Sequence, residues 1–466
     1  MLRLHINISR AVTAVAVVAA LTASSCKKFI EIQPDPTSLA PSQIFADSID
    51  ATSAITGIYI SMIGTSSAIL SIGCDGMGVW TGMAADEFDA PSNFTAKEFF
   101  TNTVSITNAF NNTYLWANAY KYIYQANACI EGVTASTGIS DAMKSRFIGE
   151  AKFLRAFYHF AMMNMYGPVP LCVVTDYKTT SLLPRADTAT LYKQIVADLE
   201  EAAQSLQNDP VPTNVARPNR YAAKALLARV YLYRQQWAAA EAAATEVIGG
   251  NYGLVNNLDS VFLVKNREAI WQVPSTSPGA ETVLGTNIVP SSAFAFPGVV
   301  FTTPLLNAFE SGDKRRTQWV TTATVSGNTY TYPYKFKLRN VVSTTAVSNP
   351  REAYTPLRLS EMYLIRAEAR LKLHEAGATD DLNKIRNRAG LVNTTASSDD
   401  DVMKAIMQER RIELFGEWGH RFFDLKRTGA IDAVMSVVKP AWKTTYALLP
   451  IPYNETQLNP NLTPNP

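Results

Sequence analysis

Histidine and cysteine are scarce in this chain, with 4 of each among 466 residues. The cysteines Cys26, Cys74, Cys129 and Cys172 match no metal-binding or redox spacing, so the last three are either buried thiols or include one disulfide. The sequence also lacks a nucleophile elbow, a phosphate-binding loop and an EF-hand loop. We therefore predict no catalytic residue, no metal ion and no cofactor.

An excess of charge of either sign is also missing. The chain has 42 basic and 40 acidic residues, and residues 1–25 hold two arginines and no acid, so the remainder is neutral. A neutral chain without a basic run gives no support for nucleic-acid binding. The apolar share of 47% and the charged share of 18% are typical of a globular protein.

The N-terminus lacks an apolar run long enough to span a bilayer. The eleven residues Ala11–Leu21 follow two arginines and precede the small residues Ala23–Ser25, which predicts a signal peptide over residues 1–25. Cys26 directly after small residues resembles a bacterial lipoprotein cleavage site, which implies lipid on Cys26. Ordinary secretion with cleavage nearby is the alternative.

A tether is predicted to follow the lipidated cysteine. Residues 26–45 contain Pro34, Pro36 and Pro41, and these prolines favour an extended segment. Such a segment would give the following domain reach from a membrane surface.

Helical periodicity dominates the chain after the tether. Apolar residues recur at helical spacing in 115–130, 147–165, 191–206, 222–247, 360–373 and 379–389. Alanines where two helices cross, with a bulky Tyr233 or Trp237 at the turn, are the packing pattern of tetratricopeptide units. Because no fixed period survives, these helix pairs are interpreted as degenerate units separated by insertions.

The segment Gln408–Gly429 mixes charges with large aromatic residues. Glu409, Glu413 and Glu417 recur every four residues, which predicts an acidic stripe on one helix. The arginines Arg410, Arg421 and Arg427 are the candidate partners, because a guanidinium suits buried bidentate pairing. We predict a structural network rather than a catalytic site, built from Glu409, Arg410, Glu413, Arg421 and Asp424.

This segment also resembles a known family. Glu409–Leu414 followed by Gly419–Arg427 is similar to the C-terminal signature of the SusD/RagB family, and Arg366–Ala369, Ile385–Leu391 and Leu448–Leu462 resemble further family segments. The resemblance implies a mostly α, SusD-like right-handed helical scaffold with tetratricopeptide-like helix pairs, long loops and short-strand insertions. Its halves would be residues 46–256 and 257–466, packed as one globular unit.

The same resemblance implies a function. Members of this family are outer-membrane lipoproteins that face the cell exterior and capture nutrients for a SusC-like, TonB-dependent transporter. The expected ligand is an oligosaccharide or, in some members, a peptide. The alternative from a different functional class is a secreted glycoside hydrolase on a helical-repeat scaffold.

Two irregular regions, Gly73–Phe110 and Asn257–Pro350, are the predicted ligand-binding loops, because long loops in a compact domain are usually functional. A sugar has a flat apolar face and a rim of hydroxyls, so its site needs aromatic rings beside amides and carboxylates. Trp80 is the first candidate, since glycines surround it and offer little else to pack against. The candidates are Asp75, Trp80, Asp86, Asp89, Asn93 and Phe94 in the first region and Trp271, Trp319, Tyr330, Tyr332 and Tyr334 in the second.

Packing under a loop is an equally good interpretation of each of these aromatics. The acids Asp86, Glu87 and Asp89 could also form the carboxylate pair of a glycosidase or part of a calcium site. Three acids in four loop residues more often form a solvated turn. The sequence alone leaves these alternatives open.

Overall fold

The computed structural model describes residues 44–63, 72, 76–207, 215–274, 281–339 and 351–466. The predicted signal peptide, the lipidation site Cys26, the tether as far as residue 43, and the candidate Asp75 lie outside the described residues. No helix in the described part is long and apolar enough to span a membrane. In these residues Cys129 and Cys172 are free thiols.

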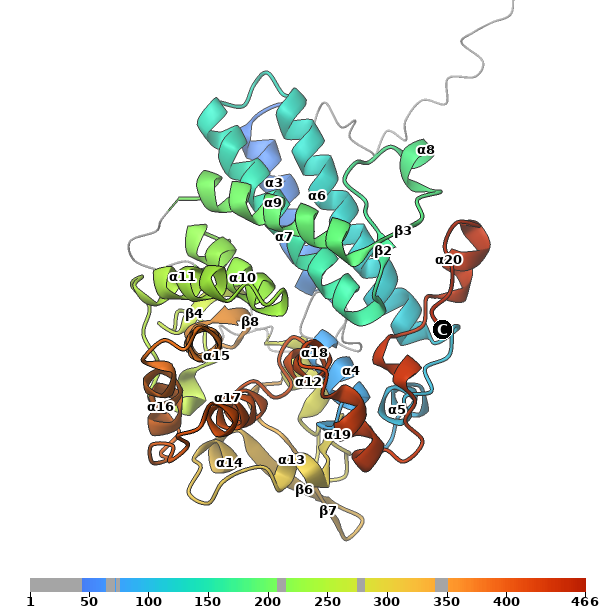
Figure 1. The fold of residues 1–466 in the computed structure, drawn as a ribbon. Coiled ribbons are helices and arrows are strands. Elements are labelled where there is room, and N and C mark those ends of the chain that lie inside the picture. Colours follow the sequence, from blue (N-terminus) through green and yellow to red (C-terminus); the bar gives the residue numbers. More distant parts are fainter. Residues whose placement is uncertain (1–43, 64–71, 73–75, 208–214, 275–280, 340–350) are drawn as a thin grey trace, which may run out of the picture.

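The N-terminal half is a stack of antiparallel helices (Figure 1). In chain order the longer elements are α3 (Ser48–Ile63), the π-helical η2 (Phe110–Ala117), α6 (Asn118–Ala135), α7 (Asp141–Tyr166), α9 (Thr188–Ser205), α10 (Arg220–Tyr233) and α11 (Trp237–Ile248). They cover the stretches whose periodicity predicted helices. Ser140 takes the N-cap position of α7, and Gly167 ends that helix with a φ of 74°.

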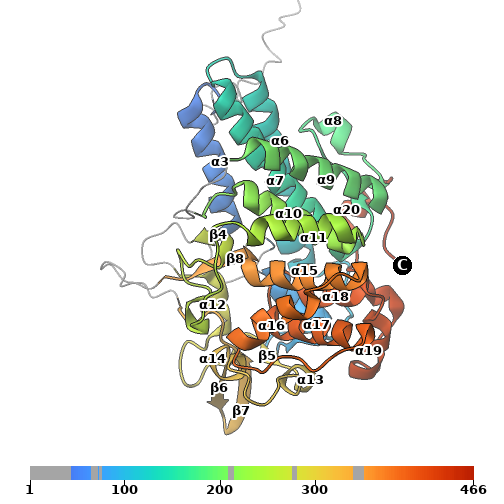
Figure 2. The ribbon, with the colours of Figure 1, turned by 60° about the vertical axis from the view of Figure 1, so that its left-hand side comes forward.

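The C-terminal half continues this stack. Helix α11 packs against α15 (Leu359–Leu373), and α15 packs against α16 (Ala378–Arg388) and α17 (Asp399–Glu413). Both views show α10 and α11 side by side, α15 below them and α17 below α15 (Figures 1 and 2). One cluster of buried apolar residues includes members from both halves, such as Phe153, Phe157 and Trp271. The remaining helices of this half are α18 (His420–Arg427), α19 (Ile431–Val438) and α20 (Tyr453–Leu458).

Short strands join segments that are distant in the sequence. The antiparallel pairs are β1 (Phe88–Asp89) with β5 (Val300–Phe301), β2 (Val169–Pro170) with β3 (Arg185–Ala186), β4 (Ala269–Pro274) with β8 (Ala353–Arg358), and β6 (Val320–Val325) with β7 (Asn328–Pro333). The expected short-strand insertions are therefore present in the second irregular region, where β4, β6 and β7 lie. The second irregular region also contains α12 (Val283–Ile288), α13 (Thr303–Leu306) and α14 (Arg315–Gln318).

The first irregular region is more regular than its composition predicted. Gly76–Ala84 forms α4 and Phe94–Thr101 forms α5. A Cβ on Gly78 would overlap the carbonyl of Gly416 and lie 2.8 Å from the backbone nitrogen of Trp418. Gly78 therefore permits close packing of α4 against the C-terminal half.

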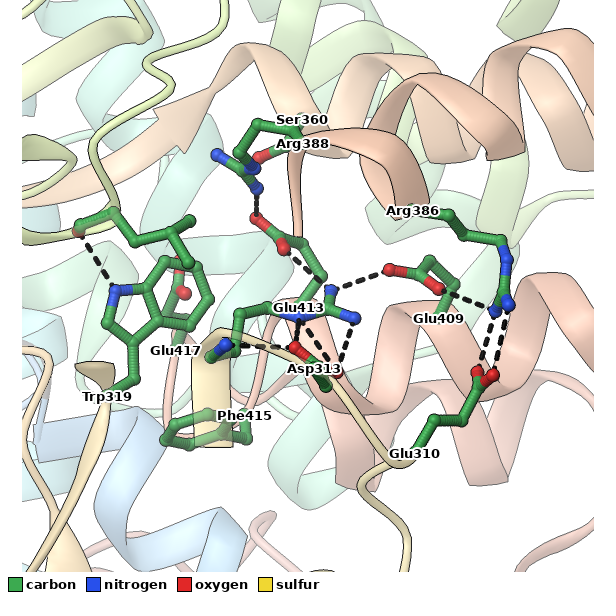
Figure 3. A network of polar contacts seen from close by, with 12 residues as sticks. Glu310, Asp313, Trp319, Ser360, Arg386, Arg388, Glu409, Glu413, Phe415 and Glu417 are labelled. Carbon is green, nitrogen blue, oxygen red and sulfur yellow. Dashed lines mark hydrogen bonds and ion pairs between the residues drawn. The ribbon is translucent and has the colours of Figure 1, made fainter. Parts of the chain in front are cut away.

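A buried charge network holds the C-terminal half together (Figure 3). The Glu413 carboxylate pairs with Arg315, Arg358 and Arg388, and all four side chains are at most 2% exposed. Burial opposes the charged form of Glu413, but the three arginines outweigh it and hold its pKa well below the usual value. Such ions need partners because desolvation costs several kcal/mol per group.

The predicted partners and the predicted stripe differ from the structure. Helix α17 ends at Glu413, so Glu417 lies in the following turn, where Gly416 and Trp418 have positive φ values of 68° and 43°. Glu417 pairs there with Arg358 and with Lys335.

The three predicted arginines bind other acids instead. Arg410 and Arg427 both pair with Asp424, and Arg427 also pairs with Glu368. Arg421 pairs with Asp86, in the first irregular region. The glutamates of the predicted stripe pair with arginines from other elements. Sequence spacing does not reveal these partners, because they are distant in the chain.

Candidate ligand-binding site

The two irregular regions meet at β1 and β5. Phe88 is paired with Phe301 in this short ladder, and Thr302 donates its backbone N–H to the carbonyl of Glu87 at 3.0 Å. Asp86 is anchored from the other side by Arg411 and Arg421. Helix α4 and the segment after α12 are thereby placed beside each other.

A cavity of about 100 Å³ lies between them. Its walls come from α4, α5 and η2 on one side and from 287–299 on the other. The predicted residues Trp80 and Asn93 both line it. The exposed Asn93 also caps α5, because its Oδ1 accepts a hydrogen bond from the backbone N–H of Ala96 at 3.0 Å.

Trp80 forms the inner wall of this cavity. Its ring stacks on Phe110 with a centroid distance of 4.7 Å and lies 5.2 Å from Phe99. Trp80 is only 5% exposed, so the expectation that it has little to pack against is wrong.

Exposed aromatic rings lie on the segment that forms the opposite wall. Phe294 is 89% exposed and Phe296 is 42% exposed, and the segment continues into the cavity-lining Gly298 and Val299. Phe296 meets the half-buried Tyr330 of β7 edge to face at 5.3 Å. We call Phe294, Phe296 and Tyr330 the aromatic rim.

Sequence reasoning missed Phe294 and Phe296. They stand two positions apart in a stretch of serine, alanine and proline, where neither a helix nor a long strand would bury them. The two rings lie at a turn, where Ala295 donates its backbone N–H to the carbonyl of Ser292 at 3.1 Å, so neither helical nor strand periodicity marked them. Tyr330 was among the candidates.

Two predicted tryptophans are core residues. Trp271 and Trp319 are both fully buried. Trp271 contacts Phe153 and Phe157 edge to face, at centroid distances of 4.9 and 5.4 Å. The Trp319 indole donates to the carbonyl of Leu258 at 3.0 Å. Neither ring offers a surface to a ligand in this structure.

The remaining candidates are scattered. Tyr332 is 6% exposed, and Tyr334 is half-buried with the Lys337 ammonium over its ring at 4.9 Å. Asp86 is buried in its arginine pairs and belongs to the structural network rather than to the cavity. Phe94 lies in α5, but its side chain is outside the described part of the structure, as is all of Asp75.

The three neighbouring acids have different surroundings. Burial disfavours ionisation of Asp86, but hydrogen bonds and charges from Arg421 and Arg411 outweigh it and lower its pKa. Burial and the adjacent Asp86 charge raise the pKa of Glu87 to about 8. Asp89 pairs with Lys97 at 2.5 Å. Since Asp86 and Glu87 are at most 2% exposed, they do not face a cleft as a hydrolytic carboxylate pair would.

Metal binding has no support in the described part of the chain. There, no group of three or more histidine, cysteine, aspartate or glutamate side chains is arranged to hold a metal ion. The aromatic and amide residues that line the cavity are Trp80, Phe110, Asn93 and Asn287.

Comparison with known proteins extends these observations. Residues 293–436 match the model described as the SusD family, and residues 28–232 match the model described as starch-binding and associating with the outer membrane. A SusD-like protein of Formosa agariphila is 25% identical over 94% of this chain and 95% of its own length. The chain belongs to the SusD/RagB family.

Other members of the family are similar to this chain in part of the sequence or in the structure. The starch-binding protein SusD of Bacteroides thetaiotaomicron is 29% identical over 28% of this chain and 24% of its own. The structure of a laminarin-binding SusD-like protein superposes with a TM-score of 0.75 at 25% identity, covering 91% of this chain and 100% of that one. A SusD-superfamily structure from Parabacteroides distasonis reaches 0.77 at 22% identity, with 92% and 99% covered, and so shows the fold alone. The predicted family and helical scaffold are confirmed.

Proposed function

We propose that this protein is a non-catalytic lipoprotein of the outer membrane, facing the cell exterior, that binds oligosaccharide and delivers it to a SusC-like, TonB-dependent transporter. The observation that carries the proposal is the aromatic rim beside the cavity of Trp80 and Asn93. Exposed rings next to amides suit the apolar face and the hydroxyl rim of a sugar. The names of the laminarin-binding and starch-binding relatives support this ligand class.

Several features speak against a hydrolase. The acids Asp86 and Glu87 are buried, and Asp86 is neutralised by two arginines. A general acid must reach the glycosidic oxygen of its substrate. Binding without bond cleavage is therefore the expected behaviour.

Delivery requires a docking surface, and the tetratricopeptide-like helices supply one. A groove of about 580 Å³ lies between α9, α10 and α11. On its rim Glu246 pairs with Arg220 at 2.6 Å and with Lys224 at 3.0 Å. Stacked helix pairs present broad surfaces to partners. We assign this face to the transporter, while the aromatic rim and its neighbouring loops would cap the transporter opening.

The lipid on Cys26 would hold the protein at the membrane through the predicted tether of residues 26–45. Metabolic labelling with a fatty acid tests this assignment. Wild-type protein should take up the label and remain with the outer membrane, and the Cys26→Ala variant should do neither. Labelling of Cys26→Ala would contradict it.

The ligand is tested by calorimetric titration of a soluble form beginning at Lys27. Laminari-oligosaccharides, malto-oligosaccharides and a peptide library are the probes, with chromatography of the glycans afterwards. Heat of binding with intact glycan supports the proposal. Shorter products would indicate a hydrolase, and heat with peptides alone would move the protein to the peptide-binding members of the family.

Partner binding is tested separately by affinity capture. Full-length protein should co-purify with a TonB-dependent transporter from solubilised outer membranes. Charge reversal at Arg220 and Lys224, on the groove rim, should reduce the yield, whereas reversal at the exposed Lys404 should not. Recovery of no transporter with wild-type protein would overturn the delivery step.

A further inference from the structure

A second pocket, of about 240 Å³, opens between the short helix α8 (Tyr177–Thr180) and α20. Both views place these two helices along one edge of the molecule (Figures 1 and 2). The pocket shares no lining residue with the cavity of Trp80. It is therefore separate from the candidate site described above.

The floor of this pocket is aromatic and rigid. Trp116 and Tyr120 lie with their ring centroids 5.1 Å apart, and Trp116 also meets Tyr166 edge to face at 5.0 Å. The Tyr120 hydroxyl donates to the carbonyl of Pro170 at 3.0 Å. These contacts fix the floor before any ligand arrives.

The two walls are also tied to each other. The Asn459 amide donates to the carbonyl of Leu183 at 2.8 Å, and the Asn461 amide donates to the carbonyl of Leu182 at 2.8 Å. These bonds join the segment after α20 to the loop after α8. These hydrogen bonds within the fold therefore fix the position of the two walls of the pocket.

Apolar side chains around the opening remain in solvent. Tyr177 is 78% exposed, Leu458 is 79% exposed, Leu182 is 51% exposed and Tyr453 is 44% exposed. Clustered exposed apolar residues mark a binding surface more often than scattered ones do. Tyr177 and Leu458 line the pocket itself.

One carboxylate faces this aromatic surface. Glu455 lines the pocket and is partly buried, and burial raises its pKa although a hydrogen bond with Trp116 opposes the shift. A carboxylate has about four acceptor positions, so one bond from an indole leaves capacity for ligand hydroxyls. Thr180 and Ser181 bring hydroxyl groups to the same lining.

We propose that this pocket binds one sugar ring as a second glycan site. The inference rests on the proposed glycan-binding function and adds to it. Tyr177 would cover the apolar face of the ring, and Glu455 would accept hydrogen bonds from its hydroxyls. A volume of about 240 Å³ is below the range of about 300–1,000 Å³ for pockets that hold drug-sized ligands, which suits a single ring.

A second site on the same molecule changes how a polysaccharide is held. A long glycan that reaches both sites binds the second one intramolecularly, so avidity exceeds either affinity. A flat protein partner fits this surface less well, because the opening is concave and combines a carboxylate with hydroxyls.

Cys172 provides a local reporter, because its side chain lines the pocket. Burial raises the pKa of Cys172 to about 11, so its alkylation by iodoacetamide is best followed at alkaline pH. Cys129 is 3% exposed and its pKa is raised to about 12, which keeps its reaction slower. A form beginning at Lys27 with the change Cys74→Ser leaves these two thiols.

The experiment measures the alkylation rate of Cys172 by peptide mass spectrometry, with and without saturating laminarihexaose or maltohexaose. At least one of the two glycans should slow the reaction about fivefold or more. Tyr177→Ala and Glu455→Gln should each remove the protection, and Val437→Ala, at an 81% exposed position that lines neither pocket, should retain it. Since Tyr177 is mostly exposed, its variant is expected to fold normally.

The outcomes separate this inference from the proposed function. An unchanged Cys172 rate with a glycan that binds by calorimetry overturns the second site and leaves the proposed function standing. Protection that survives both Tyr177→Ala and Glu455→Gln also overturns it. If neither glycan gives heat or protection, both proposals fail.

Discussion

Arg421 holds both carboxylate oxygens of Asp86, although the two residues are 335 positions apart in the sequence. Its Nε donates to Oδ1 at 2.7 Å and its Nη2 donates to Oδ2 at 2.8 Å. Arg411 adds a third bond, from Nη2 to Oδ2 at 2.7 Å. This three-residue cluster joins the family's C-terminal signature to the end of α4, the helix that carries Trp80.

The Asp86→Asn variant should lose about 3–5 kcal/mol of the free energy of unfolding, because two largely buried guanidinium groups, with side chains 15% and 10% exposed, would lose their counter-charge. Urea denaturation measures the change. Lys404→Gln is the matched control, since its pair with Asp401 is exposed and its loss should leave stability nearly unchanged. Equal effects of the two substitutions would show that the Asp86 cluster contributes little.

Gly78→Ala should destabilise the protein by more than 1 kcal/mol, roughly the lower bound for overpacking. The new Cβ would overlap the backbone of Gly416, which cannot move aside as a flexible side chain would. Gly57→Ala is the control, because that helical glycine in α3 has nothing within 4 Å of the added Cβ. The Gly57→Ala substitution should raise the free energy of unfolding by up to about 1 kcal/mol. A stabilised Gly78→Ala variant would contradict the packing role of α4.

Glu87 should make stability depend on pH. Its folded pKa of about 8 lies above the usual value of about 4.3, so the neutral form is favoured in the fold. The stability that it contributes is fully present below about pH 4.3 and is lost as the pH rises through about 8.

The Glu87→Gln variant removes this titration while keeping an oxygen that can accept the bond from the Gly416 N–H. Between pH 5 and pH 9 it should lose less stability than the wild type, by on the order of 4 kcal/mol, because the folded pKa of about 8 lies about three units above pH 5 and each unit is worth about 1.4 kcal/mol. Denaturation series at both pH values give the difference, in which the other titrating groups cancel. A difference that stays constant across this range would show that Glu87 does not titrate there.

The long helices could be predicted from the sequence because their signal is local. The stretch 222–247 repeats alanine and leucine at helical spacing, and α10 and α11 bury those residues, with Asn219 accepting a cap bond from Ala222. The family signature was readable for a related reason, since Arg410 and Asp424 both lie within it and pair with each other.

The site was less predictable because it depends on contacts between distant segments. The glycines around Trp80 suggested a loose loop. In the structure, residue 78 has no room for a Cβ because the backbone of the turn at Gly416 packs directly against it. Composition alone cannot separate the buried Trp271 from the exposed Phe296, since each stands in a segment of mixed character. Only the three-dimensional packing assigns one ring to the core and the other to solvent.

The aromatic rim yields the most direct prediction about the ligand. Phe296→Ala and Phe294→Ala should each weaken glycan binding by about 5–100-fold, in the range of roughly 1–3 kcal/mol per ring contact. Both side chains are exposed at 42% and 89%, so their removal should leave the unfolding transition nearly unchanged. Calorimetry and urea denaturation of each variant separate binding from stability.

Val437→Ala is the matched control for the rim, because Val437 is an apolar side chain on α19 with 81% exposure, and it lines neither pocket. Its affinity for glycan should equal that of the wild type. If the Phe296 variant binds as the control does, the rings of the rim do not contact the ligand, and binding must use other parts of the loops. If only the Phe variants lose affinity at unchanged stability, the sugar lies against the aromatic rim.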